Sequence, residues 1–257
     1  MRTFCIGDIH GAYLSLLNLL EQVNFDYDND KLIVLGDVCD GWSQTPESIE
    51  LLLKIKNLIY IQGNHDEWTI QFLNIPIPKY TDPIYDSYAS WFHHGGKATL
   101  DAYEKYPELI DKHIQFLSLS PIYYIDENNN LFIHAGYQPG CVNEDGTLKM
   151  GPLYKDIYLW DRNFWNSAYT GKNVAKHFNK VYIGHTPTLN YPNNKGEHLK
   201  PIIRKNVINM DTGSAFTGKL SMMNVETGEL FQSEKKSMEY YLYEFGRNNK
   251  AFARYKK

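Results

Sequence analysis

The sequence predicts an α/β fold in which buried strands alternate with helices. Short apolar runs rich in Ile, Val, Leu, Phe and Tyr recur along the chain, as expected for buried strands. Helical patterns separate the first three runs, and this order is typical of parallel β-α-β units with right-handed crossovers. Glycines and polar side chains follow each run directly, which marks the passage from strand to loop.

Six apolar runs end in polar motifs of a similar kind. In chain order they are TFCI before GDIHG, LIVL before GDVCDG, LIYI before QGNHD, LFI before HAG, VYI before GHT, and VIN before MDTG. Ligand-binding residues of parallel sheets gather at the carboxyl ends of the strands, so these motifs should meet in one crevice. The side chains expected there are Asp8, His10, Asp37, Asn64, His65, His134 and His185.

Two segments between the first three runs have the spacing of amphipathic helices. In residues 11–25, Leu14, Leu17 and Leu20 fall on one face. In residues 45–57, Thr45 is placed to cap the helix N-terminus and Pro46 to occupy the first helical position. Both helices are therefore predicted to pack against the sheet as crossovers.

The rest of the chain suggests one domain with an insertion. We expect a single domain over residues 1–232, in which residues 67–120 form a helical insertion near the crevice. Residues 219–232 read as a β-hairpin with ETG at the turn. Residues 233–257 are rich in charge and are predicted to form a C-terminal helix or tail.

Bulk properties exclude several classes of partner. The net charge is −4, which does not suit nucleic-acid binding, and no uncharged run approaches the ~20 residues of a membrane span. Three scattered cysteines, Cys5, Cys39 and Cys141, fit a reducing compartment better than a disulfide framework. The N-terminus has no basic-then-apolar leader. We therefore expect a cytoplasmic protein that binds neither nucleic acid nor a membrane.

The polar side chains at the strand ends predict a divalent metal centre. Carboxylate oxygen, amide oxygen and imidazole nitrogen suit Mn²⁺, Fe, Co²⁺ or Zn²⁺ better than Ca²⁺. Each motif alone is more commonly a turn or a packed histidine, but together they supply six ligand-type residues. That number exceeds the need of one open site and suffices for two ions that share a carboxylate.

In this order, the motifs GDIHG, GDVCDG, GNHD, HAG and GHT resemble those of the calcineurin-like metallophosphoesterases. The resemblance is to the phosphoprotein-phosphatase branch, which includes bacterial and phage protein phosphatases and symmetrical diadenosine tetraphosphatase. Residues 107–136 are similar to that branch's approach to HAG, and residues 209–232 to its closing segment. The likeness implies a metallophosphoesterase-type αββα sandwich with mixed β-sheets over residues 1 to about 232.

The resemblance also implies a role for each residue. One ion would be held by Asp8, His10 and Asp37, and the other by Asp37, Asn64, His134 and His185. The ions would be Mn²⁺ in the first place, with Fe, Zn²⁺, Co²⁺ or Ni²⁺ as alternatives. A hydroxide between them would attack phosphorus in line, with no covalent enzyme intermediate. His65 would protonate the leaving alkoxide, and Asp40 would orient His65 and keep it protonated.

The chain departs from this branch at two phosphate-binding positions. An arginine usually follows the second aspartate of GDVCDG, where Gly41 stands, and another precedes GNH, where Gln62 stands. A third arginine is matched by Arg162 in LWDRNFW, which is expected to bind the substrate phosphate. Hydrolysis of a phosphate ester is therefore predicted, while the identity of the ester stays open.

Three functions remain after these observations. The first is a metal-dependent phosphatase, similar to serine/threonine protein phosphatases, whose partner is a phosphorylated protein or small molecule. The second is a nucleotide hydrolase of the diadenosine tetraphosphatase kind, which Asp66 favours because the protein phosphatases have glutamate there. The third is a non-catalytic binding module on the same fold. It requires a broken metal or acid position, and the sequence shows none.

Overall fold

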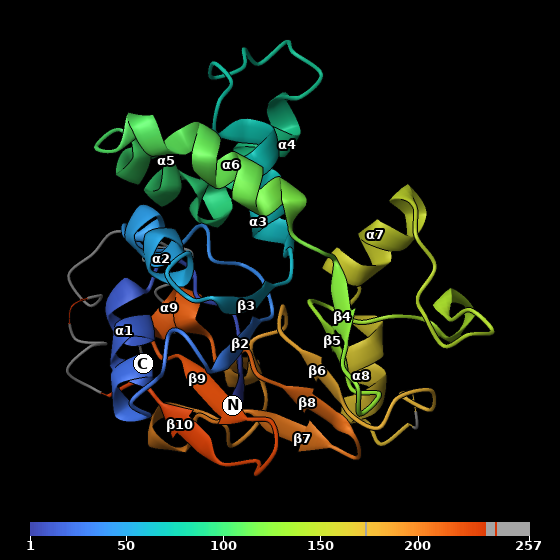
Figure 1. The fold of residues 1–257 in the computed structure, drawn as a ribbon. Helices are drawn as coiled ribbons and strands as arrows, with labels where there is room; N and C mark the ends of the chain where they lie inside the picture. Colours follow the sequence, from blue (N-terminus) through green and yellow to red (C-terminus); the bar gives the residue numbers. More distant parts are fainter. Residues whose placement is uncertain (173, 235–239, 241–257) are drawn as a thin grey trace.

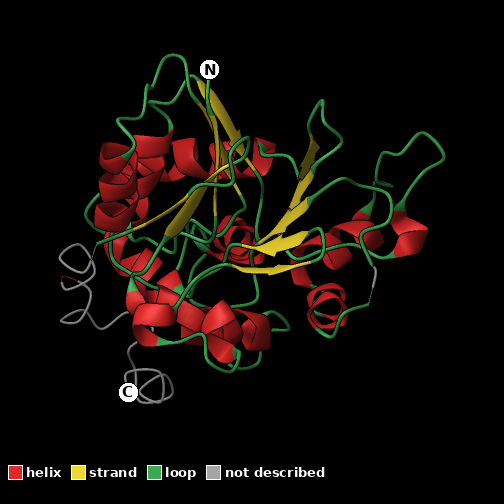
Figure 2. Ribbon diagram, turned by 90° about the horizontal axis from the view of Figure 1, so that it is seen from below, coloured by secondary structure: helices red, strands yellow, loops and turns green. Residues whose placement is uncertain are grey.

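A computed structural model of the chain describes residues 1–172, 174–234 and 240 (Figure 1). Two five-stranded mixed sheets face each other, and helices cover the outer face of each, as the view in Figure 2 also shows. This arrangement confirms the predicted αββα sandwich. The predicted C-terminal helix or tail at residues 233–257 lies, apart from 233, 234 and 240, outside the described residues.

The first sheet has the strand order β10-β9-β1-β2-β3. Its strands are β1 (Thr3–Ile6), β2 (Lys31–Val34), β3 (Asn57–Tyr60), β9 (Ser221–Asn224) and β10 (Leu230–Gln232). Strands β1, β2 and β3 are parallel, as predicted, with Phe4 beside Leu32 and Leu32 beside Leu58. Strand β9 runs antiparallel to β1 and forms the predicted hairpin with β10.

Helices α1 (Tyr13–Gln22) and α2 (Thr45–Leu52) cover the outer face of this sheet. The buried side of α1 carries Leu16, Leu19 and Leu20, whereas Leu14 and Leu17 of the predicted face are only partly buried. The helix itself carries leucines on most of its sides. Packing against the sheet therefore decided which of these leucines are buried. Thr45 was also misplaced at the N-cap. The carbonyl of Gln44 accepts the Ser48 N–H at 3.0 Å and therefore begins the helix.

The second sheet has the strand order β4-β5-β6-β8-β7. Its strands are β4 (Tyr123–Ile125), β5 (Leu131–Ile133), β6 (Val181–Ile183), β7 (Ile202–Arg204) and β8 (Val207–Asn209). Strands β5, β6 and β8 are parallel, and the two edge strands are antiparallel to their neighbours. Helices α7 (Pro152–Trp160) and α8 (Asn163–Tyr169) pack on the outer face of this sheet.

An apolar layer joins the inner faces of the two sheets. Cys5 and Ile33 of the first sheet pack in one cluster with Phe132 and Tyr182 of the second. The rings of Phe132 and Tyr182 stack with centroids 4.7 Å apart. This packing aligns the two sheets, so that the carboxyl ends of their parallel strands lie at the same edge of the sandwich.

A group of helices between β3 and β4 lies over that edge (Figure 1). They are α3 (Asn64–Phe72), α4 (Tyr85–Trp91), the π turn η1 (Phe92–Gly96), α5 (Lys97–Tyr103), the 3₁₀ turn η2 (Pro107–Leu109) and α6 (Ile110–Leu119). Phe72, Tyr88 and Trp91 form a small core of their own between α3 and α4. The remaining short elements are η3 (Pro139–Cys141), η4 (Thr188–Asn190), η5 (Gly196–His198) and α9 (Ser214–Thr217).

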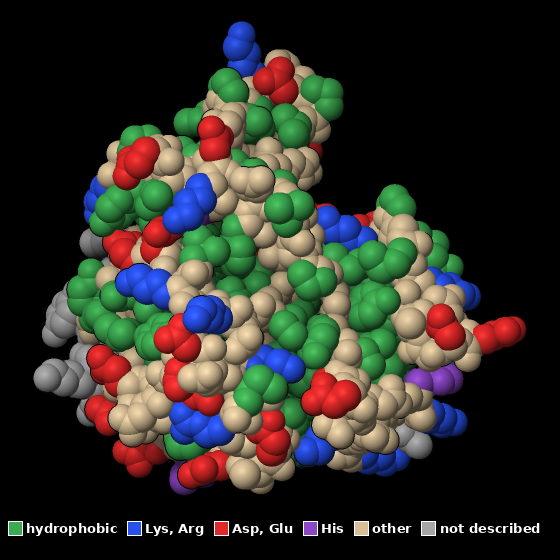
Figure 3. Space-filling model, in the orientation of Figure 1, with side chains coloured by type: hydrophobic (Ala, Val, Ile, Leu, Met, Phe, Trp, Pro, Cys, Tyr) green, Lys and Arg blue, Asp and Glu red, His purple; other side chains and the backbone are tan. Residues whose placement is uncertain are grey.

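The surface in Figure 3 carries positive and negative side chains interspersed over one face, with apolar side chains between them. Among the described helices, none combines the length and apolarity needed to cross a bilayer. Cys5, Cys39 and Cys141 are buried free thiols.

Candidate metal centre

Every residue predicted to bind metal follows a strand and is buried at the common edge of the two sheets. Asp8 and His10 follow β1, Asp37 follows β2, Asn64 begins α3 after β3, His134 follows β5, and His185 follows β6. Each sheet therefore supplies ligand-type side chains to one region. The structure brings all six of them together.

Asp37 lies at the centre of this group. Ligand atoms of Asp8, Asp37 and His134 all lie within 4.8 Å of one another. Oδ2 of Asp37 is 3.4 Å from Nε2 of His134 and 3.7 Å from Nε2 of His10. The same Nε2 of His10 is 3.9 Å from Oδ2 of Asp8. One carboxylate is therefore adjacent both to the Asp8–His10 pair and to His134.

Asn64 contacts both histidines that follow strands of the second sheet. Its Oδ1 lies 2.9 Å from Nε2 of His134 and 2.8 Å from Nδ1 of His185. The other ring nitrogen of His185, Nε2, is buried and has no hydrogen-bond partner within the described part of the chain. Asn64, His134 and His185 thus form a second cluster beside Asp37.

Backbone carbonyls fix which nitrogen of two histidines faces the centre. Nδ1 of His10 is 2.9 Å from the Cys39 carbonyl, and Nδ1 of His134 is 2.7 Å from the Leu35 carbonyl. Donation from Nδ1–H to these carbonyls leaves Nε2 as the lone-pair nitrogen. This is the arrangement by which proteins orient metal-binding imidazoles.

The charges of the centre suit a cation. Burial opposes ionisation of Asp37, but His134, His65 and His10 outweigh it and hold the pKa of this carboxyl well below its usual range. Burial, assisted by the carboxyl of Asp211, raises the pKa of Asp8 well above its ordinary value, although His134 acts in the opposite direction. Burial also lowers the pKa of His185, which leaves its ring neutral and able to bind metal. Carboxylate, amide and neutral imidazole donors in one buried cluster fit divalent ions.

Asp40 and His65 form a pair of their own beside this cluster. Nδ1 of His65 is 2.7 Å from Oδ2 of Asp40, and Asp40 is fully buried. The ring of His65 lies 5.0 Å from that of His10, centroid to centroid. The two acids of GDVCDG therefore have different neighbours: Asp37 faces the ligand cluster, while Asp40 contacts His65.

Arg162 lies at the edge of the same region. It is exposed, and its Nη1 donates to the His185 carbonyl at 3.2 Å and to Thr186 Oγ1 at 3.3 Å. These bonds hold the guanidinium beside His185. Its contact to a substrate phosphate stays a prediction.

A family model described as calcineurin-like phosphoesterase matches residues 1–209. The chain belongs to the calcineurin-like phosphoesterase family. It is accordingly a phosphoester hydrolase that depends on divalent metal ions.

Among curated relatives, this phosphoesterase is similar to the asymmetrical bis(5'-nucleosyl)-tetraphosphatase PrpE of Bacillus cereus (strain B4264). The two are 26% identical over 250 residues, which cover 86% of this chain and 89% of the relative. The PrpE of Bacillus anthracis (strain CDC 684 / NRRL 3495) is also 26% identical, over 252 residues that cover 87% of this chain and 90% of the relative.

Solved structures share the fold at lower identity. A metallophosphoesterase from Sphaerobacter thermophilus superposes with a TM-score of 0.53 at 17% identity and covers 94% of this chain and 93% of its own. A protein serine/threonine phosphatase from Saccharomyces cerevisiae gives a TM-score of 0.55 at 13% identity, covering 91% and 80%. At such identities the likeness shows the fold alone.

Asp66 has a structural role that the sequence did not reveal. Its buried carboxylate accepts the backbone N–H groups of Asp37, Val38 and Gly63 at 2.9, 3.1 and 2.9 Å. It also accepts the Tyr60 hydroxyl at 2.6 Å. Asp66 therefore fixes the loop that carries Asp37. The only signal in the sequence was an acid in the first turn of a helix, which is common in helices generally.

A second acid, Asp211, lies in the MDTG motif that follows β8. Its Oδ1 accepts the Gly213 N–H at 2.8 Å, and its charge contributes to the raised pKa of Asp8. Asp211 is buried near the ligand cluster, but it is not one of the predicted metal ligands.

Gly41 and Gln62, the two positions where the resembled branch usually has arginine, make structural contacts in this chain. Nε2 of the buried Gln62 donates to the Leu117 carbonyl at 3.0 Å, in the last turn of α6. Gly41 has a φ of +107°, which an arginine would adopt only with strain, and its N–H donates to the Gly95 carbonyl at 3.3 Å. Both positions therefore anchor the helices that lie over the site.

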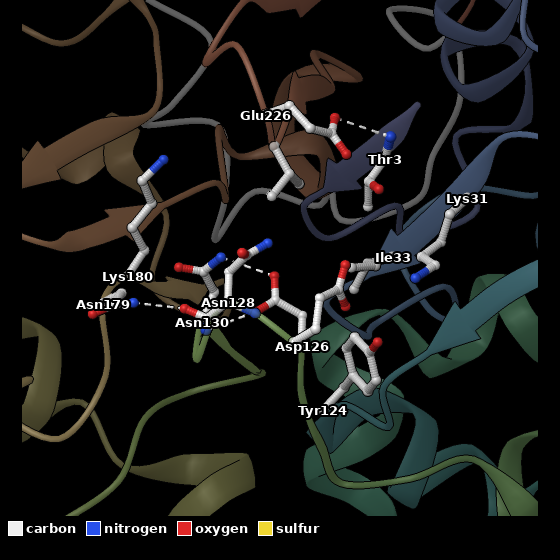
Figure 4. A pocket seen from close by; sticks show the side chains of 12 residues that line it. Thr3, Lys31, Ile33, Tyr124, Asp126, Asn128, Asn130, Asn179, Lys180 and Glu226 are labelled. Carbon is white, nitrogen blue, oxygen red and sulfur yellow. Dashed lines mark hydrogen bonds between the residues drawn. The ribbon is translucent and has the colours of Figure 1, made fainter. Parts of the chain in front are cut away.

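A cavity of about 310 Å³ lies at the opposite edge of the sandwich, near the amino ends of β1 and β2 (Figure 4). Glu226 accepts the Thr3 N–H at 3.1 Å, and Asp126 accepts the Asn130 side-chain amide at 2.8 Å. These carboxylates are thus bonded locally, and the cavity has no donor set comparable to that of the metal centre among the described residues.

Two glycines allow metal-site carboxylates to approach the backbone. A Cβ atom at Gly63 would lie 2.1 Å from Oδ1 of Asp37, and one at Gly184 would lie 2.0 Å from Oδ1 of Asp8. We predict that Gly63→Ala and Gly184→Ala displace these carboxylates and lower the metal content of the purified protein severalfold. Gly140→Ala is the control, because its Cβ would meet nothing within 4 Å. Full metal content in both site variants, measured by elemental analysis, would contradict the prediction.

Proposed function

We propose that this phosphoesterase hydrolyses phosphate esters with two divalent ions that share the carboxylate of Asp37. The observation that supports the proposal is the position of Asp37 Oδ2, within 4 Å of both His10 Nε2 and His134 Nε2. Asp8, His10 and Asp37 would hold one ion, and Asp37, Asn64, His134 and His185 the other. Bound there, the ions, which we take to be Mn²⁺, would activate a water molecule for in-line attack and neutralise phosphate charge.

His65 is proposed as the general acid. Its Nδ1 lies 2.7 Å from Oδ2 of Asp40, and Nε2 is the nitrogen that we assign to give a proton to the leaving oxygen. The carboxylate of Asp40 favours the protonated ring and fixes its orientation. The ring of His65 lies 5.0 Å from that of His10, a proposed ligand of the first ion, which supports this role.

The substrate proposed first is a phosphomonoester, such as a phosphoserine or phosphothreonine side chain. A nucleotide is the second candidate, and the tryptophans at the site favour it. The partly exposed rings of Trp68 and Trp160 lie 4.8 Å apart, and Trp68 is 5.1 Å from His65. Trp160 lies 6.3 Å from His185. Aromatic rings in such a position can stack on a nucleotide base. The relatives named PrpE are bis(5'-nucleosyl)-tetraphosphatases, a name that describes the hydrolysis of dinucleoside tetraphosphates.

A kinetic comparison separates these substrates. If a nucleotide is the substrate, diadenosine tetraphosphate should have a higher kcat/KM than a phosphoserine peptide. Trp68→Ala should then raise KM for the dinucleotide about tenfold, since a stacked base contributes about 1–3 kcal/mol. The peptide should be little affected. An equal change for both substrates would exclude base stacking, and failure of the metal-loaded protein on every activated phosphoester would favour the binding module.

Metal stoichiometry tests the shared carboxylate. We predict two ions per chain at saturation, because the proposed ligand set is divided between two clusters. Asp37→Asn should lose more metal than Asp8→Asn, since Asp37 serves both ions. Elemental analysis after loading with Mn²⁺ measures both effects. One ion per chain in fully active protein would show the dinuclear proposal to be wrong.

Replacing His65 tests the general acid. We predict that His65→Asn slows the hydrolysis of esters with poor leaving groups by ~10²–10⁴, and that of aryl phosphates with good leaving groups much less. The metal content should stay unchanged, because His65 is not in the proposed ligand set. The exposed His198, changed to Asn, is the control. Equal losses across the leaving-group series would count against proton donation by His65.

Arg162 should carry an unusually large share of phosphate binding, because Gly41 and Gln62 stand where the resembled branch usually has arginines. We predict that Arg162→Ala lowers kcat/KM for a phosphomonoester by about 10²–10³, as loss of a transition-state donor typically does. Arg162→Lys should recover only part, because an ammonium cannot make paired bonds to phosphate. Arg204→Ala, on strand β7, is the control. A change below about threefold in Arg162→Ala would leave this arginine without a catalytic role.

A further inference from the structure

The carboxylate of Asp40 is surrounded by donors from the helices over the site. Nε1–H of Trp91 lies 3.1 Å from Oδ1 and 3.0 Å from Oδ2 of Asp40. The Thr99 hydroxyl donates to Oδ1 at 2.7 Å. All three side chains are buried. The same carboxylate meets His65 through Oδ2, so Asp40 connects the proposed acid to α4 and α5.

Thr99 holds the backbone of Asp40 as well as its side chain. The hydroxyl oxygen of Thr99 accepts the Asp40 N–H at 2.9 Å. Asp40 has a left-handed φ of +66°, which is uncommon for a residue other than glycine. The next residue, Gly41, donates its N–H to the Gly95 carbonyl at 3.3 Å. The loop that carries Asp40 is therefore held at three points by the segment between residues 91 and 99.

The sequence HHGG, residues 93–96, leaves space for the indole of Trp91. Gly95 has a φ of +115°, at the kink of the π turn between α4 and α5. A Cβ atom at Gly96 would lie 2.4 Å from Cε2 of Trp91, so the indole packs directly on the glycine backbone. These four residues thereby allow Trp91 to reach Asp40.

We propose that Trp91 and Thr99 are positioning residues for the general acid. A buried carboxylate without hydrogen-bond donors is costly to ionise, and the bonds from Trp91 and Thr99 hold the Asp40 carboxylate in one orientation. In that orientation Oδ2 faces Nδ1 of His65 at 2.7 Å, which fixes the ring and presents Nε2–H to the leaving oxygen. The helices over the site thus orient the proposed general acid His65 through Asp40, while the loops after the strands carry the proposed metal ligands. This inference rests on the proposed role of His65.

The test removes each donor with the variants Trp91→Phe, which keeps an aromatic ring, and Thr99→Val, which keeps the shape of the side chain. Each should lower kcat about tenfold for an ester with a poor leaving group and only slightly for a good one, because a misaligned acid matters most where the leaving oxygen needs its proton. KM and metal content should not change. Gly96→Ala should reproduce the pattern of Trp91→Phe by displacing the indole. Trp165→Phe, an equally buried tryptophan in the core beneath the second sheet, is the matched control and should leave the series unaffected.

A spectroscopic measurement supplies a readout other than turnover. The indole N–H resonance of Trp91, assigned by its loss in Trp91→Phe, should exchange slowly with solvent and shift upfield in Asp40→Asn. The inference is overturned if Asp40→Asn gives leaving-group-dependent losses while Trp91→Phe and Thr99→Val give uniform losses or none. If Asp40→Asn itself shows no such dependence, the proposed general acid fails, and the inference fails with it.

Discussion

The backbone contacts of Asp37 hold the site together. The carbonyl of Asp37 accepts the N–H groups of Ile9 and His10 at 3.0 and 2.8 Å, which ties the loop after β2 to the loop after β1. Its amide donates to Asp66 of α3 at 2.9 Å, and its Oδ1 accepts the His65 N–H at 2.9 Å. One residue thus joins three successive strand-to-loop transitions of the first sheet. The proposed ligands of both ions and the proposed acid depend on its position.

This dense arrangement explains the unusual backbone of the site. His10, Asp37, Asp40 and His185 all have left-handed φ angles between 52° and 66°. Such conformations are held only where the surrounding contacts are strong, and they cluster at functional sites. The hydrogen bonds of the Asp37 loop and the close approach of carboxylates to Gly63 and Gly184 provide that constraint. The result is a site with little freedom to rearrange, which suits the fixed geometry that metal ligands require.

The two aspartates of GDVCDG owe their different proposed roles to different environments. Asp37 lies among imidazoles from both sheets, and His134, His65 and His10 hold the pKa of its carboxyl low. Asp40, three residues later, points toward α4 and α5 and accepts hydrogen bonds from neutral donors and His65. The sandwich therefore supplies the proposed metal ligands, and the helices over its edge support the proposed proton donor. A change in these helices could tune the acid without altering the metal centre.

Much of the fold and of the residue group around Asp37 could be predicted from the sequence, because the patterns that indicate them are local. Strand runs, crossover segments and the polar residues that follow each strand lie within a few positions of one another, and they predicted the α/β fold and the group around Asp37. The roles of these residues in metal binding and proton transfer stay predictions. Tertiary structure alone decided that α1 buries Leu16 and Leu19, that Gln62 bonds to α6, and that Trp91 and Thr99 hold Asp40. The last two contacts span 51 and 59 residues. No pattern of local spacing encodes them, because they exist only once the helices have packed over the sheets.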